Sequence, residues 1–134
     1  MTTSKERLAT AAATTLIILQ TVMLLSLYSK TFPHPPETVA PFGIAPFLGA
    51  SLSFAAIALI FQPTQDRMGR VFGVLAALSA LVSYGPQKYF DAQIGYIWPS
   101  VLIGQLAALT LIVVIWQARN NSTTDQERER NLPA

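Results

Sequence analysis

The long stretches between Arg7 and Lys30 and between Asp91 and Arg119 contain no charged residue. Each is longer than the roughly 20 apolar residues that a helix needs to cross a hydrocarbon core of about 30 Å. The composition agrees, because 51% of the residues are hydrophobic and 12% are charged, against about 25% charged residues in an ordinary soluble domain. The sequence therefore predicts an integral membrane protein.

The apolar residues divide into four predicted membrane spans. In chain order these spans cover residues 8–28, 42–61, 71–87 and 97–118. The third is the shortest, and it reaches full depth only if residues 84–90 continue it into the headgroup layer. The predicted fold is all-α, a single up-down-up-down four-helix transmembrane bundle, followed by a polar, solvated tail at 119–134.

The first span has a rival interpretation as a secretory signal peptide, because Lys5 and Arg7 precede it. The apolar region of a signal peptide is about 7 to 15 residues long and ends at a small-residue cleavage site. This span is longer and runs into Tyr28, Ser29 and Lys30. We therefore expect a retained helix.

The basic residues predict the orientation of the chain. Of the nine Lys and Arg residues, seven fall in the amino terminus, the 62–70 loop and the tail, and only Lys30 and Lys88 fall on the other side. Cytoplasmic loops carry the excess of basic residues, so both termini are expected in the cytoplasm, at a bacterial inner membrane. Because these residues flank apolar spans and form no basic face, the expected partner is a lipid bilayer and not nucleic acid.

Chemistry-bearing residues are scarce in this chain. The predicted spans contain no Asp, Glu, Lys, Arg or His, one of which proton-coupled carriers generally need. The chain has no cysteine for a disulfide, a thiolate metal site or a nucleophile. The single histidine, His34, lies between two prolines without further metal or haem ligands nearby. We therefore predict no catalytic residue, no metal, no cofactor and no enzymatic activity.

One layer of polar side chains recurs in the outer half of the predicted spans. Counted at 1.5 Å per residue, it comprises Gln20, Ser51, Ser83 (or Ser79 in its place) and Gln105. These side chains are either ordinary interhelical contacts worth about 0.6 kcal/mol each or the floor of a ligand pocket. Either way, Gln20 and Gln105 are expected to face each other or a shared cavity.

The connector SYGPQKYFDAQIGYIWPS, residues 83–100, joins the last two spans. We expect Gly85-Pro86 to break the third helix and Pro99 to start the fourth. Its interfacial residues are Tyr84, Lys88, Tyr89, Asp91, Tyr96 and Trp98. They form either a hinge with an aromatic belt or the rim of a headgroup, quinone or partner-protein pocket. The spacing of Lys88 and Asp91 favours a mutual ion pair.

Small residues recur at helical spacing on three predicted spans. These faces comprise Gly49, Ser53 and Ala56; Gly73, Ala76, Ala77 and Ala80; and Gly104 with Ala108. Such faces let helices approach closely. Three of them in one small chain leave room for one to face another subunit or a second copy.

Three classes of function remain. The first, which we predict, is a non-enzymatic accessory or assembly subunit of a larger membrane complex. The second is a binder of a quinone or another lipid-like molecule in an outer-half pocket. The third is a small oligomeric transporter, which the lack of a charge within the spans disfavours.

The distribution of basic residues gives a testable topology. A reporter active only in the cytoplasm should be active when fused after Ala134 or after Pro63, because both positions lie on the basic-rich side. Activity from a fusion at Pro35 would contradict a four-span chain with both ends in the cytoplasm.

Overall fold

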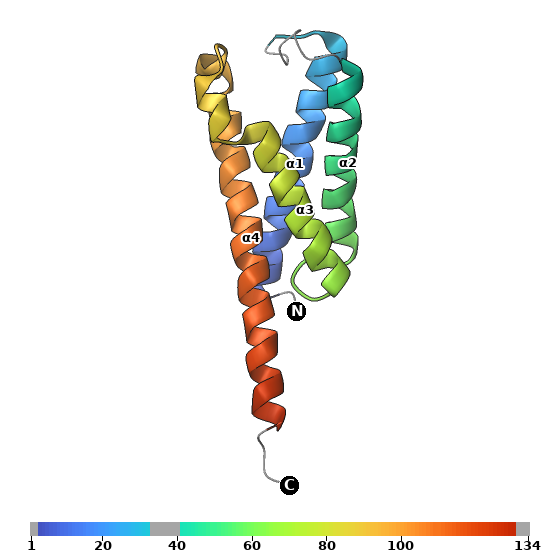
Figure 1. Cartoon of the computed structure of the whole chain (residues 1–134), viewed down its shortest axis with the longest axis vertical. Coiled ribbons are helices and arrows are strands. Elements are labelled where there is room, and N and C mark those ends of the chain that lie inside the picture. The colour runs from blue at the N-terminus through green and yellow to red at the C-terminus, as the bar shows by residue number, and fades with distance from the viewer. Residues whose placement is uncertain (1–2, 33–40, 131–134) are drawn as a thin grey trace.

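The computed structural model describes residues 3–32 and 41–130, and every regular element in these ranges is a helix (Figure 1). The elements are α1 (Ser4–Ser29), α2 (Pro41–Ile60), α3 (Arg67–Tyr84), the 3₁₀ helix η1 (Pro86–Phe90) and α4 (Ile94–Arg130). Four of the helices are long and apolar enough to span a membrane. The predicted four-helix membrane fold is therefore confirmed.

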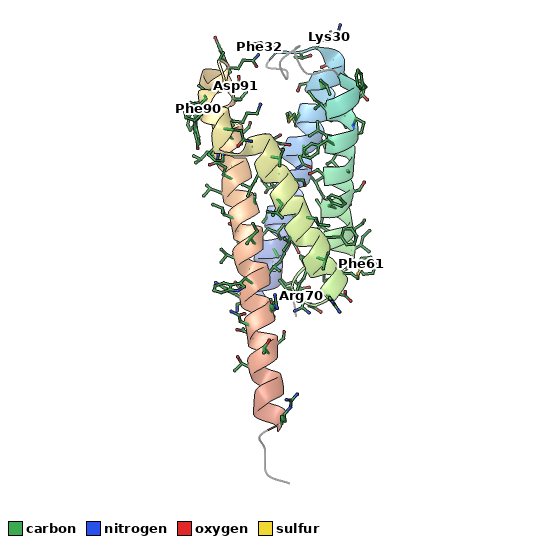
Figure 2. The ribbon with its side chains drawn as sticks, viewed as in Figure 1. Lys30, Phe32, Phe61, Arg70, Phe90 and Asp91 are labelled. Carbon is green, nitrogen blue, oxygen red and sulfur yellow. The ribbon has the colours of Figure 1, made fainter. Side chains whose placement is uncertain are left out.

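The four long helices alternate in direction and form a closed ring (Figure 1). Each of α1 and α3 packs against both α2 and α4, and α1 and α3 also touch across the centre of the ring. Figure 2 places Lys30, Phe32 and Asp91 at one end of the bundle, which we call the η1 end. Phe61 and Arg70 lie toward the opposite end, where α1 begins.

Side-chain caps explain where two of the helices begin. The hydroxyl of Thr3 accepts a hydrogen bond of 3.2 Å from the Glu6 N–H at the start of α1. A carboxylate oxygen of Asp66 accepts one of 2.6 Å from the Met68 N–H at the start of α3. The first N–H groups of a helix have no partner within it, so these caps stabilise both starts.

The end of α3 lies at Tyr84, as the Gly85-Pro86 pair predicts. Proline has no N–H to continue the helical ladder. A Cβ on residue 85 would collide with the Leu81 carbonyl oxygen and the Gln87 side chain, so only glycine fits there. The chain then continues as η1 instead of extending α3 to residue 87.

The fourth helix is longer than the sequence predicts. It begins at Ile94 instead of Ile97, and it continues to Arg130, well past the expected end at Ala118. Residues 119–130 contain neither proline nor glycine to stop a helix. The hydroxyls of Ser122 and Thr123 donate to carbonyls one turn earlier, at 2.9 and 3.2 Å. A polar composition alone did not reveal this extension, which projects beyond the bundle (Figure 1).

The core is built largely from small side chains of α1, α3 and α4. It contains Ala9, Ala12, Ala13, Leu16, Ala77, Ala80, Ala107, Ala108, Leu111, Val114 and Ile115. The predicted small-residue faces of α3 and α4 are both buried. Small residues let helix backbones approach closely. In lipid there is no hydrophobic driving force between helices, so this close packing stabilises the bundle instead.

The predicted small-residue face of α2 lies outside the bundle. Ser53 and Ala56 are exposed, and a Cβ built on Gly49 would meet no atom within 4 Å. Among the described residues, this is therefore the most exposed of the three small-residue faces.

Three glycines provide a graded test of this packing. A Cβ on Gly104 would lie 2.9 Å from Cβ and Cγ of Tyr84, whereas one on Gly73 would meet the mobile end of Ile115 at 2.6 Å. We expect Gly104→Ala to lower the free energy of unfolding by about 1–3 kcal/mol, Gly73→Ala to lower it less, and Gly49→Ala not to lower it. Unfolding in detergent-denaturant titrations measures all three, and equal losses would contradict this packing.

Candidate functional site

A chain of hydrogen bonds links three helices in the half of the bundle nearer η1. The Gln20 Nε2 donates to the Ser51 Oγ at 2.6 Å, and the Ser51 Oγ lies 2.6 Å from the Ser79 Oγ. Ser79 in turn donates to the Ala76 carbonyl at 3.0 Å. Gln20 and Ser51 are 1% and 0% exposed. We call Gln20, Ser51 and Ser79 the polar chain.

The direction of the polar chain follows from counting hydrogens. A hydroxyl has one hydrogen to donate, and Ser79 gives its own to Ala76. Ser51 must then donate to Ser79, so it can only accept from Gln20. The amide nitrogen of Gln20 therefore faces Ser51. Its oxygen, Oε1, is buried and has no hydrogen-bond partner among the described residues.

The opposite direction of the hydrogen bonds in the polar chain would be less favourable. If Ser79 donated to Ser51 and Ser51 to the glutamine oxygen, the bond from Ser79 to Ala76 would be lost. Two hydrogen bonds would then replace three, and the Gln20 NH₂ group would lose its acceptor. The free atom at this layer is consequently an acceptor.

Gln105 belongs to a separate network, in which both ends of its amide are occupied. Its Nε2 donates to the Tyr84 carbonyl at 3.0 Å, and its Oε1 accepts from the Tyr89 hydroxyl at 3.2 Å. The Tyr84 carbonyl is free because the Lys88 N–H, its helical partner in an unbroken helix, bonds to Gly85 instead. Gln105 thus stabilises the broken end of α3.

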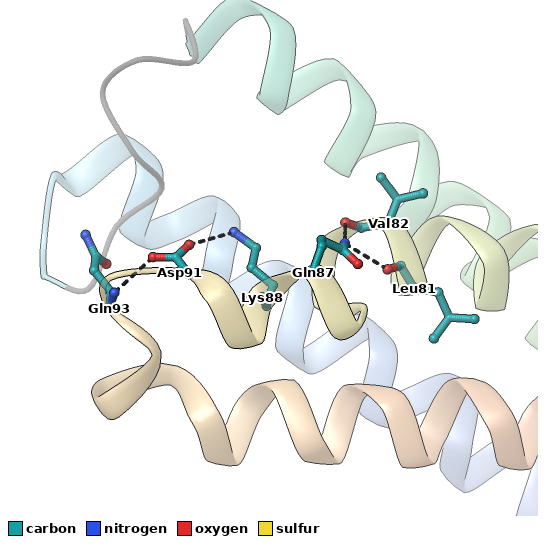
Figure 3. A network of polar contacts seen from close by, with 6 residues as sticks. All are labelled: Leu81, Val82, Gln87, Lys88, Asp91 and Gln93. Carbon is teal, nitrogen blue, oxygen red and sulfur yellow. Dashed lines mark hydrogen bonds and ion pairs between the residues drawn. The ribbon is translucent and has the colours of Figure 1, made fainter.

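Gln87 serves the same broken end, as Figure 3 shows. Pro86 cannot supply an N–H to the Val82 carbonyl. The Gln87 Nε2 donates to that carbonyl at 2.6 Å and to the Leu81 carbonyl at 3.2 Å. Sequence reasoning missed this role, although a glutamine directly after Gly-Pro is a signal that could have revealed it.

Tyr84 is buried and points into the bundle instead of lying at the rim. Its hydroxyl donates to the Leu19 carbonyl of α1 at 2.8 Å. The end of α3 is therefore fastened to α1 through this hydroxyl and to α4 through Gln105.

The structure places the predicted layer residues in two groups. Gln20 and Ser51 lie in the polar chain, where Ser79 provides the contact from α3. Ser83 is buried one turn further on. Helices α1 and α4 are neighbours, but Gln20 and Gln105 have different hydrogen-bond partners and share none.

The predicted pairing of Lys88 with Asp91 is confirmed. The Lys88 Nζ lies 3.2 Å from an Asp91 carboxylate oxygen, and the other oxygen accepts from the Gln93 N–H at 3.0 Å. The Gln93 N–H, followed by Lys88, lowers the pKa of the Asp91 carboxyl. Figure 3 shows the pair on the side of η1 turned away from α4. Each of the two charges therefore has a partner of opposite sign.

The remaining rim residues are aromatic and exposed. Tyr89, Tyr96 and Trp98 all expose about half of their surface or more. The Tyr96 ring packs edge-on against Phe32, with centroids 5.0 Å apart, and so joins the end of α1 to the start of α4. Their role as an interfacial belt stays a prediction, and His34 lies outside the described residues.

An open hollow of about 530 Å³ lies at the opposite end of the bundle. Its lining comprises Thr3, Ser4, Lys5, Thr64, Gln65, Ala118 and Asn121. Within residues 3–32 and 41–130, no three His, Cys, Asp or Glu side chains form a possible metal site. Apart from Lys5 the lining residues are neutral, and the Thr64 Oγ1 is buried without a partner among the described residues. The open hollow indicates no particular ligand.

Comparisons of the chain with protein-family models, with curated proteins and with solved structures find no match. The fold defines the class, a small four-span membrane protein. Of the two polar networks in this half of the bundle, only the polar chain has a buried acceptor without a partner among the described residues. In the other network, both ends of the Gln105 amide are occupied.

Double-mutant cycles test the separation of the two networks. The coupling between Gln20→Leu and Ser51→Ala should be about 0.6 kcal/mol and at most about 1.7 kcal/mol. Gln20→Leu and Gln105→Leu should instead add within about 0.3–0.5 kcal/mol, because they share no partner. Unfolding of single and double variants in lipid–detergent mixtures provides both values. Strong coupling between the two glutamines would show one connected network.

Proposed function

We propose that this protein is a non-enzymatic accessory or assembly subunit of a larger membrane complex, which it contacts through the exposed face of α2. The observation that carries this proposal is the small-residue face at Gly49, Ser53 and Ala56, where Ser53 and Ala56 are exposed and a Cβ on Gly49 would meet no atom of the described residues within 4 Å. Another transmembrane helix could approach closely there.

The burial of the helices supports the choice of α2. Only 22% of the membrane-spanning part of α2 is buried in the bundle, against 44% of that of α3. Exposed Ala50 extends the same side of the helix between Gly49 and Ser53. The exposed side of α4 carries large residues such as Leu106 and Leu109, so its surface is less even. Close backbone approach is therefore easiest along α2.

The proposed orientation has both termini in the cytoplasm, at a bacterial inner membrane. Seven of the nine basic residues favour it, because cytoplasmic ends of spans carry the excess of Lys and Arg. In this orientation the α4 extension to Arg130 projects into the cytoplasm.

A second candidate function is binding of a lipid-like molecule at the layer of the polar chain. The unpartnered Gln20 Oε1 favours it, because a polar group without a partner in a membrane interior is costly. This candidate is compatible with the first, since the polar chain lies inside the bundle and the α2 face lies outside it.

Photocrosslinking in native membranes tests the proposed function. A photoreactive residue at position 53 should form an adduct with a second membrane protein, and Gly49→Leu should abolish that adduct by preventing close approach. The same photoreactive residue at position 109, on exposed α4, is the control and should label lipid.

Adducts with lipid alone from position 53 would contradict the proposal. An adduct with a second copy of the chain, and with nothing else, would also contradict it, because the α2 face would then serve self-association.

A further inference from the structure

The Gln20 Oε1 is a buried hydrogen-bond acceptor inside an apolar bundle. The residue is 1% exposed, and the oxygen has no partner among the described residues. By contrast, Gln105 uses both ends of its amide, on Tyr84 and Tyr89, and Gln87, which donates to the end of α3, is exposed. In this half of the bundle, the polar chain therefore has a buried acceptor left for a group from outside the protein; the other buried side-chain atom without a partner among the described residues, Thr64 Oγ1, lies at the opposite end.

On the side of the η1 end, the buried residues above the Gln20 Oε1 come from α3, where Ser83 and Tyr84 are buried and the Tyr84 hydroxyl donates to the Leu19 carbonyl. Gln20 is the last buried residue described in α1, Leu48 is the first in α2, and Val101 is the first in α4. From Gln20 to the end of α1 at Ser29 the distance is about 13 Å. Over that length the side chains of α1 are half-buried or exposed, so a molecule entering from the η1 end would pass beside Tyr84 and displace no buried core residue of α1, α2 or α4.

We propose that Gln20 Oε1 accepts a hydrogen bond from the hydroxyl of an amphipathic molecule, a long-chain alcohol or a long-chain phenol such as a hydroquinone. The proposal rests on the second candidate function and specifies the polarity of its ligand. The hydroxyl lies at the depth of the polar chain, and the apolar part of the ligand contacts the half-buried side chains between Gln20 and the η1 end.

The direction of the polar chain selects a donor. Ser79 gives its hydrogen to Ala76, and this fixes the nitrogen of Gln20 on Ser51 and the oxygen toward the ligand. A quinone, ketone or ether offers only acceptors. It could accept a hydrogen bond at the position of Oε1 only if the polar chain reversed and lost the bond from Ser79 to Ala76. One hydrogen bond of this kind corresponds to about a 2- to 12-fold difference in affinity.

Paired probes test this polarity directly. The full-length protein in phosphatidylcholine nanodiscs is photolabelled with hexadecanol that carries a diazirine near its hydroxyl, and unlabelled hexadecanol competes against hexadecyl methyl ether. The two competitors share the same alkyl chain and oxygen, and the ether carries a methyl group in place of the hydrogen that the alcohol can donate. Hexadecanol should compete about 2- to 12-fold better than the ether, and the label should map to residues next to Gln20. A long-chain hydroquinone and its quinone, compared in the same way, distinguish a phenolic from an aliphatic hydroxyl.

Variants locate the interaction. Gln20→Leu should abolish the preference for hexadecanol, and Ser51→Ala should weaken it, because the amide would lose the contact that fixes its orientation. Gln105→Leu is the matched control, since it removes an amide of similar depth whose two ends are both occupied. The preference should survive in this control. The comparison of alcohol and ether on the unaltered protein requires no variant to fold.

Equal competition by alcohol and ether would overturn the proposed polarity while leaving a lipid-like ligand at this layer. Labelling that avoids the surroundings of Gln20 would overturn both the proposed polarity and the proposed ligand site. An ordered water as the only partner of Oε1 would do the same. Neither result depends on the photocrosslinking of α2, so failure of the ligand and failure of the accessory function are distinguishable.

Discussion

Backbone carbonyls that lose their helical partners need other donors, and close to a hydrocarbon core little water is available to supply them. The break at Gly85-Pro86 creates this need at the end of α3. Side-chain amides satisfy it: Gln87 donates to Val82 and Leu81, and Gln105 donates to Tyr84. The arrangement of η1 and the start of α4 depends on these bonds, since Gln105 comes from α4 and joins it to the broken helix.

The same accounting separates the two polar networks of the bundle. Gln105 uses both ends of its amide, so it is explained as part of the structure. Gln20 uses only its nitrogen, and the single hydrogens of Ser51 and Ser79 fix that choice. A residue type and a depth in the membrane are therefore insufficient to assign a site. The decisive property is whether each donor and acceptor has a partner.

Sequence periodicity and charge predicted the four spans, the break of α3 and the Lys88–Asp91 pair, because these depend on length, proline chemistry and local spacing. They could not predict which amide faces which neighbour. The depth of a residue follows from counting along the helix, whereas the direction of its side chain around the helix depends on packing. Packing gives Gln20 and Gln105 different hydrogen-bond partners. Polar composition at residues 119–130 likewise concealed a helix, since solvated helices need no apolar face.

Magnetic resonance on the protein in lipid bilayers tests the central claim most directly. With tyrosine labelled by ¹³C at the carbonyl and glutamine by ¹⁵N at the side chain, a through-space peak should connect the Tyr84 carbonyl carbon with the Gln105 Nε2, whose hydrogen bond to the carbonyl oxygen is 3.0 Å long. Gln105→Leu should remove that peak and identify it. A Tyr84 carbonyl with no glutamine contact, in a protein that keeps four membrane helices, would contradict the account.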